Sequence, residues 1–408
     1  MELIGIELEQ AVELVLQYGA EQMKTHSLPV MKAGGSILAE DIYAPIYNPP
    51  FDRSPLDGFA LRACDSASAT KDHPVCLLVI DTVYAGEHCV KEVKTGEAVR
   101  IMTGAPIPLG ADCVIRQEDT SFHPSNSEYI VEIYKELKHH ENYCFQGEDV
   151  KKGQLLIEAG TKITYIEQGI LASIGITQVT VYQKPRVALF VTGDEVVPPG
   201  SELKKGKIYD SNLSLIYNRL REFGMEPVIA EYLPDHVAKI ADSIRKVSDH
   251  ADIIITTGGV SVGVKDIFHE VVPMLDISRI FWKVNLKPGT PAMFSVYQGI
   301  PLLNLSGNPF AAITTFELLA RPLLAKMSCD KSLNAVKLKG TLAEPFTKTS
   351  GARRFLRGRY SEGKVHIPPT EKHASGILTS MSGCNCLVDI KAGSKPLTMG
   401  DEIEVILL

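Results

Sequence analysis

The sequence has few of the features that mark membrane or nucleic-acid-binding proteins. Its 408 residues contain one tryptophan and no apolar run that approaches the roughly 20 residues needed to cross a bilayer. A formal charge of −7 disfavours non-specific binding to nucleic acid, although local Lys and Arg clusters can still attract anions. With 45% hydrophobic and 22% charged residues, the chain is typical of a soluble, multidomain globular protein without a membrane or nucleic-acid partner.

The eight cysteines do not form a disulfide or zinc framework. The closest pair, Cys384 and Cys386, has no second pair at the spacing of a structural zinc site, so we expect reduced thiols. We expect an amphipathic helix at the N-terminus, where acidic residues interrupt the apolar positions Leu3, Ile4, Leu8, Val12, Val15 and Leu16. This pattern is not that of a signal segment, and a cytoplasmic, reducing location is the resulting expectation.

The first half of the chain is predicted to contain a proline-rich linker and a small β-rich domain. Three prolines make Ile42–Pro50 extended. Residues 51–140 then carry β-like runs separated by turns and by the polar stretch Ser121–Ser127; the runs are Val75–Ile80, Ala98–Ile101 and Cys113–Ile115. Residues 148–183 are turn-rich and β-like, and we expect them to pack with the N-terminal helix.

From Pro185 onward, apolar strand-like runs alternate with helical patterns. Four such alternations predict a central α/β domain with a largely parallel sheet covered by helices. Beyond Ser328 the pattern returns to short strands, which predict a C-terminal β domain resembling a barrel or a sandwich. The expected domains are 1–50 with about 141–183, then 51–140, 184–328 and 329–408.

Three glycine-bearing turns in the α/β region each follow an apolar run that is typical of a buried strand. In chain order they are Thr192–Glu195, Thr257–Ser261 and Ser306–Pro309. Because ligands of open parallel sheets bind beyond the carboxyl ends of the strands, we expect these turns to converge on one phosphate-like oxyanion. The residues expected to approach it are Gly258, Gly259, Ser261, Gly263, Ser306, Gly307, Asn308 and Pro309. Tight turns alone would explain the glycines about equally well.

Acidic residues gather at the same predicted strand ends. Asp194 and Glu195 are expected to hold a hard cation such as Mg²⁺, one directly and the other through water, although a turn or cap explains this pair about equally well. Asp210, Asp235 and Asp266 stand at predicted loop–helix junctions, where a helix cap explains each one better than a metal ligand does. Their shared position at strand ends favours a joint role.

Two groups of cations are candidates for anion contacts. If the segment between Lys283 and Lys287 is extended, their spacing of four places both on one side, where they attract a dianion. Arg353, Arg354 and Arg357 form a second possible clamp. Solvated lysines and an exposed basic strand edge explain these residues about as well.

Two compact turns in the small β-rich region are further candidates. Asp57 lies in the segment Asp52–Gly58, and Thr103 lies in the segment Met102–Pro106. Turn formation explains Asp57 and Thr103 about as well as ligand contact does. No serine or histidine belongs to a nucleophile–base pattern, and His139-His140-Glu141 is expected to be solvated.

Several segments, in this order along the chain, resemble the molybdopterin molybdenumtransferase family over nearly its full length. They are Phe51–Gly58, Arg100–Pro106, Gly147–Asp149, Thr192–Glu195, Gly258–Gly263, Lys283–Gly289 and Ser375–Ser380. The resemblance implies an elongated four-part homodimer whose cleft lies between subunits. It also implies a reaction that inserts molybdate into adenylylated molybdopterin, cleaves the phosphoanhydride and releases AMP, with Mg²⁺ assisting.

The resemblance further implies roles for single residues. Glu195, Asp266 and Asp194 would bind Mg²⁺ with support from Asp235, and Lys283 and Lys287 would offset molybdate or phosphate charge. Asp57, Thr103 and Glu148 would act from the small β domain. Cofactor contacts are expected from Gly104, Arg357 and Ser375, in addition to Asp194 and the glycine turns.

Two positions depart from the family's pattern. Ser306 stands where a proline is common, and Thr290 stands where a lysine often follows Lys-Pro-Gly. These changes bear on the anion contacts and leave tungstate open as an alternative to molybdate. A non-catalytic molybdopterin scaffold or carrier and a molybdopterin adenylyltransferase are the alternative functions. Other cofactor-biosynthesis proteins and apo-molybdoenzymes are the expected protein partners.

Overall fold

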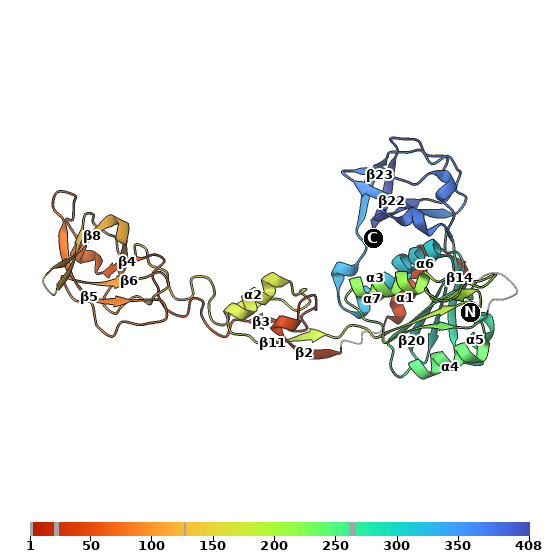
Figure 1. The fold of residues 1–408 in the computed structure, drawn as a ribbon, viewed down its shortest axis with the longest axis horizontal. Coiled ribbons are helices and arrows are strands. Elements are labelled where there is room, and N and C mark those ends of the chain that lie inside the picture. Colours follow the sequence, from red (N-terminus) through yellow and green to blue (C-terminus); the bar gives the residue numbers. More distant parts are fainter. Residues whose placement is uncertain (1–2, 20–23, 126–127, 261–266) are drawn as a thin grey trace. The chain divides into compact units, whose positions relative to one another are not determined.

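The structure is a computed structural model that describes residues 3–19, 24–125, 128–260 and 267–408. The chain divides into two compact units, which are described separately: a large unit of residues 1–26, 35–39 and 180–408, and a small unit of residues 27–34 and 40–179. Their ribbons are drawn in Figure 1. None of the described helices is long and apolar enough to cross a membrane.

A mixed sheet forms the centre of the large unit. Within the described residues its strands lie in the order β1 (Leu3–Ile6), β17 (Ser278–Val284), β19 (Met293–Tyr297), β20 (Ile300–Leu305), β16 (Ile253–Thr257), β12 (Val187–Thr192) and β15 (Ile229–Leu233). Strands β15, β12, β16 and β20 are parallel, β19 is antiparallel to β20, and β17 is antiparallel to β19. The carboxyl ends of all these strands except β19 therefore meet at one edge, and the predicted largely parallel sheet is confirmed.

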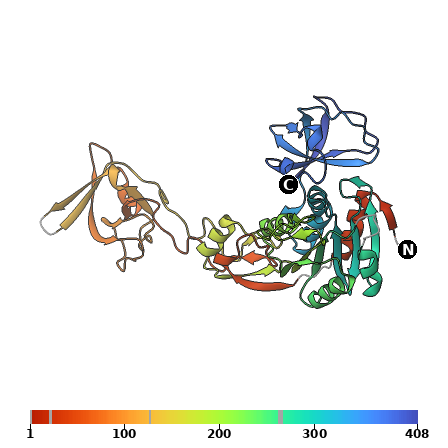
Figure 2. The ribbon, with the colours of Figure 1, turned by 45° about the vertical axis from the view of Figure 1, so that its right-hand side comes forward.

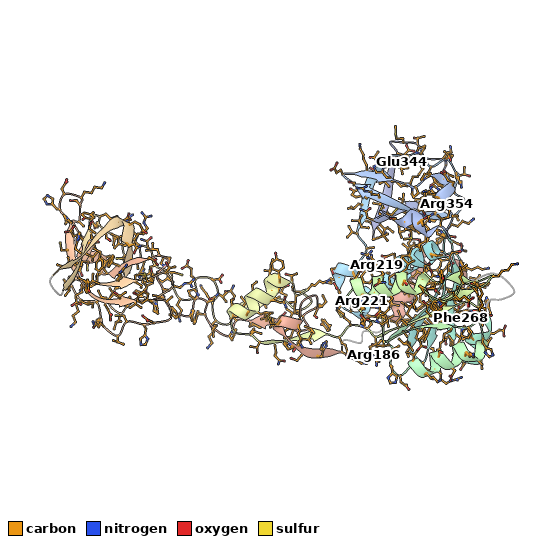
Figure 3. All side chains as sticks on the ribbon, viewed as in Figure 1. Arg186, Arg219, Arg221, Phe268, Glu344 and Arg354 are labelled. Atoms are coloured by element: carbon orange, nitrogen blue, oxygen red, sulfur yellow. The ribbon has the colours of Figure 1, made fainter. Side chains whose placement is uncertain are left out.

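Helices cover both faces of this sheet. One face packs against α1 (Leu8–Tyr18), α3 (Asn212–Glu222), α6 (Pro309–Thr315) and α7 (Arg321–Met327), and the other packs against α4 (Val237–Val247) and α5 (Phe268–Met274). Successive strand residues alternate between these cores: Leu189 belongs to the first and Phe190 to the second. Phe268 of α5, labelled in Figure 3, is fully buried in the second core.

The N-terminal segment differs from its prediction. Leu3–Ile6 is a strand rather than the first turn of a helix, and Leu3 and Ile4 pair in parallel with Phe281 and Trp282 of β17. Helix α1 begins only at Leu8 and packs against α7 and β17, and its packing with residues 148–183 stays a prediction. The ladder with β17 satisfies backbone groups that the first helical turn would have left unpaired, which explains the change.

The C-terminal region is a closed barrel, blue in Figure 2. Its described strands run in the order β22 (Arg353–Ser361), β23 (Lys364–His366), β21 (Lys337–Leu342), β25 (Glu402–Leu407) and β24 (Cys386–Ile390), and β24 pairs with β22 to close the ring. The short strand β18 (Leu286–Lys287) adds to β22. A barrel is thus confirmed over a sandwich.

The small unit contains a second sheet. Its described strands run in the order β7 (Cys113–Arg116), β4 (Gly58–Leu61), β6 (Glu97–Ile101), β5 (Val75–Val83), β9 (Glu128–Ile133) and β8 (Thr120–Ser125). The polar stretch Ser121–Ser127 was expected to separate strands, but most of it is β8, paired antiparallel with β9. Pairing with a neighbouring strand overrides the low β propensity of this stretch.

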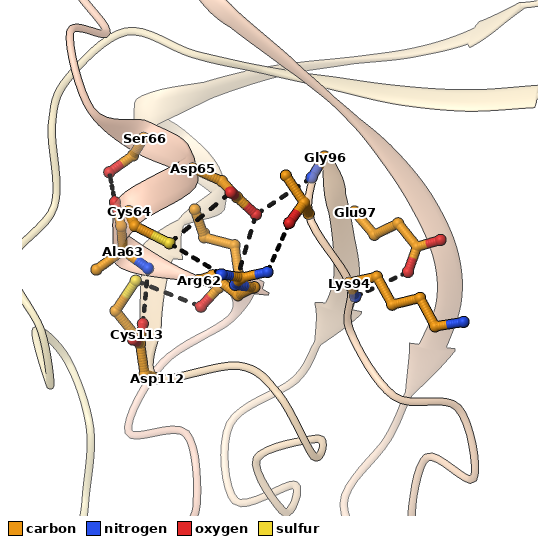
Figure 4. A network of polar contacts seen from close by, with 12 residues as sticks. Arg62, Ala63, Cys64, Asp65, Ser66, Lys94, Gly96, Glu97, Asp112 and Cys113 are labelled. Atoms are coloured by element: carbon orange, nitrogen blue, oxygen red, sulfur yellow. Dashed lines mark hydrogen bonds and ion pairs between the residues drawn. The ribbon is translucent and has the colours of Figure 1, made fainter.

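Polar contacts tie the loops of this second sheet together (Figure 4). The backbone N–H of Ala63 donates to Asp112 Oδ1 at 2.6 Å, and the N–H of Gly96 donates to Asp65 Oδ2 at 3.2 Å. Arg62 donates to Thr95 Oγ1 at 2.6 Å. These bonds satisfy groups at strand ends, so the turns of the small unit keep fixed positions on its sheet.

The rest of the small unit contains one helix that the sequence did not predict, α2 (Tyr165–Ser173). Thr164 and Glu167 form a capping box at its start, a signal that the sequence does carry. A two-stranded sheet of β3 (Ile42–Tyr43) and β10 (Leu155–Ile157) accompanies α2. A second one, of β2 (Thr25–Pro29) and β11 (Gln178–Tyr182), lies where the chain passes from one unit to the other. The four domain boundaries expected from the sequence stay a prediction.

An ion cluster around a buried carboxylate joins the barrel to α1. Arg353 donates from Nε and Nη2 to the carboxylate of Asp389 at 2.9 and 2.7 Å, and its Nη1 donates to Glu9 of α1. Lys391 also contacts Asp389, at 2.6 Å. The Asp389 side chain is 0% exposed, so this carboxylate depends fully on its cationic partners.

We expect Asp389→Asn to destabilise the large unit by about 3 kcal/mol, because the buried Arg353 loses its carboxylate. Burial by itself raises the pKa of Asp389, but hydrogen bonds from Arg353 and Lys391 outweigh burial and lower this pKa. The resulting stability is present above the unfolded pKa of about 3.9 and is lost as the pH falls through the folded value. The free energy of unfolding, measured by calorimetry at decreasing pH, should therefore fall less steeply in the variant.

Glu402→Gln is the matched control, since Glu402 and Lys339 form an exposed pair in the same barrel at 2.8 Å. We expect it to change the free energy of unfolding by less than about 1 kcal/mol. Equal losses in the two variants would show that burial of Asp389 has no special importance.

Candidate active site

The three glycine turns meet at the carboxyl edge of the large sheet. A Cβ on Gly258 would lie 2.3 Å from the carbonyl oxygen of Thr192, and one on Gly307 would lie 3.6 Å from Cα of Gly258. The N–H of Gly258 also donates to the carbonyl of Leu305 at 3.1 Å. The turns that follow β12, β16 and β20 are therefore in direct contact.

Only glycine fits at the central turn. Gly258 has φ +89° and Gly259 has φ +67°, and a Cβ on Gly259 would lie 2.7 Å from the side chain of Ile267. Because the N–H of Gly258 is bonded to Leu305, this amide links two turns instead of pointing at a ligand. Gly258, which the sequence placed beside the oxyanion, therefore offers no free amide donor to a ligand. Ser261 and Gly263 lie outside the described residues.

Asn212, at the start of α3, links the second and third turns, and the sequence reasoning missed it. Its Nδ2 donates to the carbonyl of Gly307 at 2.8 Å and lies 3.4 Å from Thr257 Oγ1. The residue is 6% exposed, and its Oδ1 has no partner among the described residues. An asparagine in a first helical turn is common, so only its burial reveals the role.

Asp210 caps the start of a helix, which the sequence analysis favoured over a role as metal ligand. Its carboxylate accepts hydrogen bonds from the N–H groups of Asn212 and Leu213, both at 3.0 Å. Burial raises the pKa of Asp210 even though these bonds act in the opposite direction. Asp210 thus fixes the helix turn that presents Asn212.

The structure brings Asp194 and Asp235 together. The N–H of Asp194 donates to Asp235 Oδ2 at 3.3 Å, and the N–H of Asp235 donates to Asp194 Oδ1 at 3.1 Å. These residues follow β12 and β15, whose last residues Thr192 and Leu233 are paired. The carbonyl of Asp194 also accepts a hydrogen bond from Lys207, so the turn is held from both sides.

The carboxylates fit a magnesium ion only if a ligand shares it. Mg²⁺ usually takes one or two carboxylates and completes its shell with waters and substrate phosphates. Asp194 and Asp235 supply two carboxylates, and Glu195 is exposed beside Gly193. No group of three or more His, Cys, Asp or Glu residues in the described part of the chain could hold a metal. Asp266, predicted as a ligand, lies outside that part.

The two lysines do not share one side of an extended strand. Lys283 lies near the end of β17 with a left-handed φ of +66°, and Lys287 lies in β18, paired with Arg354 of the barrel. The assumption of a continuous extended segment is therefore wrong, because the left-handed residue breaks the alternation of side chains. Lys283 still reaches the carboxyl edge, since β17 runs in the same direction as β20.

Residues of the barrel meet the third turn. The N–H of Phe310, in the first turn of α6, donates to the carbonyl of Ser375 at 3.1 Å. Asn308 precedes α6, and Pro309 occupies its first turn. A Cβ on Gly376 would lie 3.9 Å from Asn308 Oδ1. Ser306–Pro309 and Ser375 are thus neighbours.

Arg357 is a buried cation beside the same turn. Its guanidinium carbon lies 4.3 Å from the centre of the Phe310 ring, and Nη2 donates to the carbonyls of Lys372 and Ala374. Its Nε and Nη1 have no partner among the described residues. Burial lowers the pKa of Arg357, but an arginine stays charged at neutral pH. By contrast, Arg353 is neutralised by Asp389 and Glu9 and so leaves the predicted three-arginine clamp, while Arg354 donates to Ser350 Oγ at 3.3 Å.

In the small unit, Asp57 and Thr103 are joined directly. Asp57 Oδ1 accepts hydrogen bonds from the backbone N–H and from Oγ1 of Thr103, both at 2.7 Å. Gly104 has φ +84° and donates to the carbonyl of Ser54 at 2.8 Å. Glu148 accepts from the N–H of Phe145 at 3.1 Å, so it closes its own turn.

We expect Gly258→Ala to be far more damaging than Gly200→Ala. Both glycines are left-handed, with φ +89° and +87°, but only Gly258 has a carbonyl where the new methyl group would lie. The shared left-handed cost is about 1–2 kcal/mol, and the clash adds to it only at Gly258. Thermal unfolding measures the difference. Equal melting temperatures for the two variants would contradict the contact between turns.

We expect Thr103→Val to raise the pKa of Asp57, because the side-chain hydrogen bond from Thr103 is the main cause that lowers it. The backbone N–H bond remains, so the shift is partial. Carboxyl ¹³C NMR titration measures this pKa, and Thr103→Ser, which keeps the hydroxyl, is the control. If valine and serine give the same pKa, Thr103 does not hold Asp57 through its hydroxyl.

Known families match this arrangement along nearly the whole chain. Residues 6–175 match the MoeA N-terminal region (domain I and II), residues 188–326 match a probable molybdopterin binding domain, and residues 339–408 match the MoeA C-terminal region (domain IV). The second match contains the three glycine turns, and the third contains Arg357 and Ser375.

Individual relatives agree with these matches. The molybdopterin molybdenumtransferase of Bacillus subtilis (strain 168) is 33% identical over 405 residues, which cover 99% of this chain and 94% of that protein. Two solved molybdopterin biosynthesis MoeA proteins from Pyrococcus horikoshii have TM-scores of 0.85 and 0.80 at 33% and 30% identity. Both matches cover 99% of this chain, and 99% and 100% of those chains. The resemblance seen in the motifs is confirmed: the chain belongs to the MoeA family of molybdopterin molybdenumtransferases.

Proposed function

We propose that the protein inserts molybdate into adenylylated molybdopterin, cleaving the phosphoanhydride and releasing AMP. The main support is the contact of three glycine turns, with Asn212, Arg357 and the Asp194–Asp235 pair around them. An anionic ligand can approach the backbone of these turns closely, and it meets amide groups and side chains of both charges in fixed positions.

The turns and Arg357 would hold the pterin and phosphate end of the substrate. Nε and Nη1 of Arg357 are donors without protein partners in the described residues, and they stand next to the Ser375 segment. Likewise, Oδ1 of Asn212 is an acceptor without a protein partner in the described residues. A heterocycle with N–H donors and a phosphate with oxygen acceptors satisfies both kinds of group.

Lys283 would act on a different part of the substrate. Strand β17 is two positions from β20 and three from β16 in the sheet, which places its backbone roughly 10–14 Å from their turns. One compact phosphate cannot span this distance, but an adenylylated pterin together with molybdate can. We assign Lys283 to molybdate or phosphate, and we place Lys287, on β18, farther along the same anionic substrate.

Magnesium would be held by Asp194 and Glu195, with Asp235 in support and Asp266 as a further ligand. When bound, this ion neutralises phosphate charge and orients the leaving group. The protein's own part is to fix the two aspartates, which it does through their reciprocal backbone hydrogen bonds.

The remaining assignments rest on the family resemblance. Asp57, Thr103, Gly104 and Glu148 would act from the small unit, in a cleft completed by a second subunit. The homodimer, the cytoplasmic location and contacts with other cofactor-biosynthesis proteins or apo-molybdoenzymes stay predictions. Ser306 and Thr290 keep tungstate open as an alternative oxyanion.

Purified protein should release AMP from adenylylated molybdopterin when molybdate and Mg²⁺ are both present. We expect Glu195→Gln to weaken the dependence on Mg²⁺, because it removes a carboxylate ligand. Lys283→Ala should lower molybdate-dependent turnover roughly 10²-fold, because it removes a positive charge that opposes the substrate's. Chromatography of AMP and cofactor transfer to an apo-molybdoenzyme measure the two products.

Exposed residues of the same charge provide the controls. Asp249→Asn and Lys246→Ala should leave both products unchanged, since both residues are exposed and lie at the end of α4, just before β16 begins at the opposite edge of the sheet. Binding of the substrate without AMP release would favour a carrier. Formation of adenylylated molybdopterin from ATP would favour an adenylyltransferase, and either result would overturn the proposal.

A further inference from the structure

Lys283 is held on the face of the chain's single tryptophan. Its Nζ lies 3.9 Å from the centre of the Trp282 ring. In a regular strand these consecutive side chains would point to opposite faces of the sheet. The left-handed φ of +66° at Lys283 allows its side chain to fold back over Trp282. A lysine adopts this conformation only where its surroundings impose it.

The Trp282 ring is itself fixed. Trp282 packs against the core under α4 and α5, and its strand partner is the buried Met293. His269 of α5 meets the indole edge-on, with ring centres 4.4 Å apart and an angle of 90° between the planes. Arg279 Nη1 donates to His269 Nδ1 at 2.6 Å, which sets the orientation of the imidazole. The indole face is thus a rigid support.

The support leaves the charge of Lys283 available. No carboxylate lies within ion-pair distance of Lys283 among the residues that the structure describes. A carboxylate partner would compete with an incoming oxyanion and would have to be displaced. An indole face attracts the ammonium without neutralising it, and it also restricts the rotamers of a long side chain.

We propose that Trp282 is a positioning residue for the reaction, which holds the Lys283 ammonium at the carboxyl edge of the sheet in a charged, ordered state ready for the incoming oxyanion. This inference rests on the proposed function, because it names the residue through which Lys283 reaches molybdate or phosphate. The predicted consequence is a higher KM for molybdate when the ring is lost.

A double-mutant cycle tests whether Trp282 acts through Lys283. Molybdate-dependent AMP release is measured for the unmodified protein, Trp282→Leu, Lys283→Met and the double variant. We expect Trp282→Leu to raise the KM for molybdate roughly three- to thirtyfold, the range of a cation–π contact. In the Lys283→Met background the same change should have almost no effect. Equal effects in both backgrounds would overturn the inference, since a structural loss is additive.

Trp282→Phe is the conservative variant and should recover part of the lost affinity, because phenylalanine offers a smaller aromatic face. Melting temperatures of all variants are recorded in parallel. If Trp282→Phe is as impaired as Trp282→Leu while both keep the melting temperature of the unmodified protein, the aromatic face is not what positions Lys283.

Tryptophan fluorescence separates this inference from the proposed function. Since Trp282 is the only tryptophan, Lys283→Met should shift or intensify its emission with no substrate present, and Lys239→Met should not. Unchanged emission in Lys283→Met would overturn the inference whatever the enzyme does. Absent AMP release by the unmodified protein, with the emission shift observed, would overturn the proposed function alone.

Discussion

The common direction of β12, β15, β16, β20 and β17 is the constraint on which the site depends. It brings the carboxyl ends of segments far apart in sequence to one edge of one sheet. The approach of Gly258 to the Thr192 carbonyl then leaves no room for a side chain between neighbouring turns. Helix α6 and the barrel complete the site, because the N–H of Phe310 donates to the carbonyl of Ser375 and its ring packs against the guanidinium of Arg357.

The charged groups near the carboxyl edge of the large sheet are either held by other protein groups or able to bind a ligand. Asp194 and Asp235 are oriented by each other's backbone N–H groups, and Asp210 accepts hydrogen bonds from N–H groups at the start of α3. Arg353 is neutralised by Asp389 in the barrel, whereas Arg357 keeps two donors without protein partners. A dianionic reactant therefore finds cations that no carboxylate of the described chain already occupies, and this distinction matters more than the number of basic residues.

The sequence predicted the parts of the site that depend on local chemistry. Glycines after apolar runs located the turns at the strand ends. Residues whose role depends on packing were missed: Asn212 and Trp282 look ordinary until burial and strand register are known. The left-handed Lys283 broke the spacing argument for the two lysines, and pairing with β17 turned Leu3–Ile6 into a strand. Such tertiary contacts leave no periodic pattern in a single sequence.

Anomalous diffraction from crystals grown with tungstate, a heavy analogue of molybdate, tests the central claim most directly. The account predicts a tungsten peak at the carboxyl edge of the large sheet, within hydrogen-bonding distance of Lys283 or of the turns that follow β12, β16 and β20. Tungsten bound only at the opposite edge of the sheet, or only on the outer surface of the barrel, would contradict it.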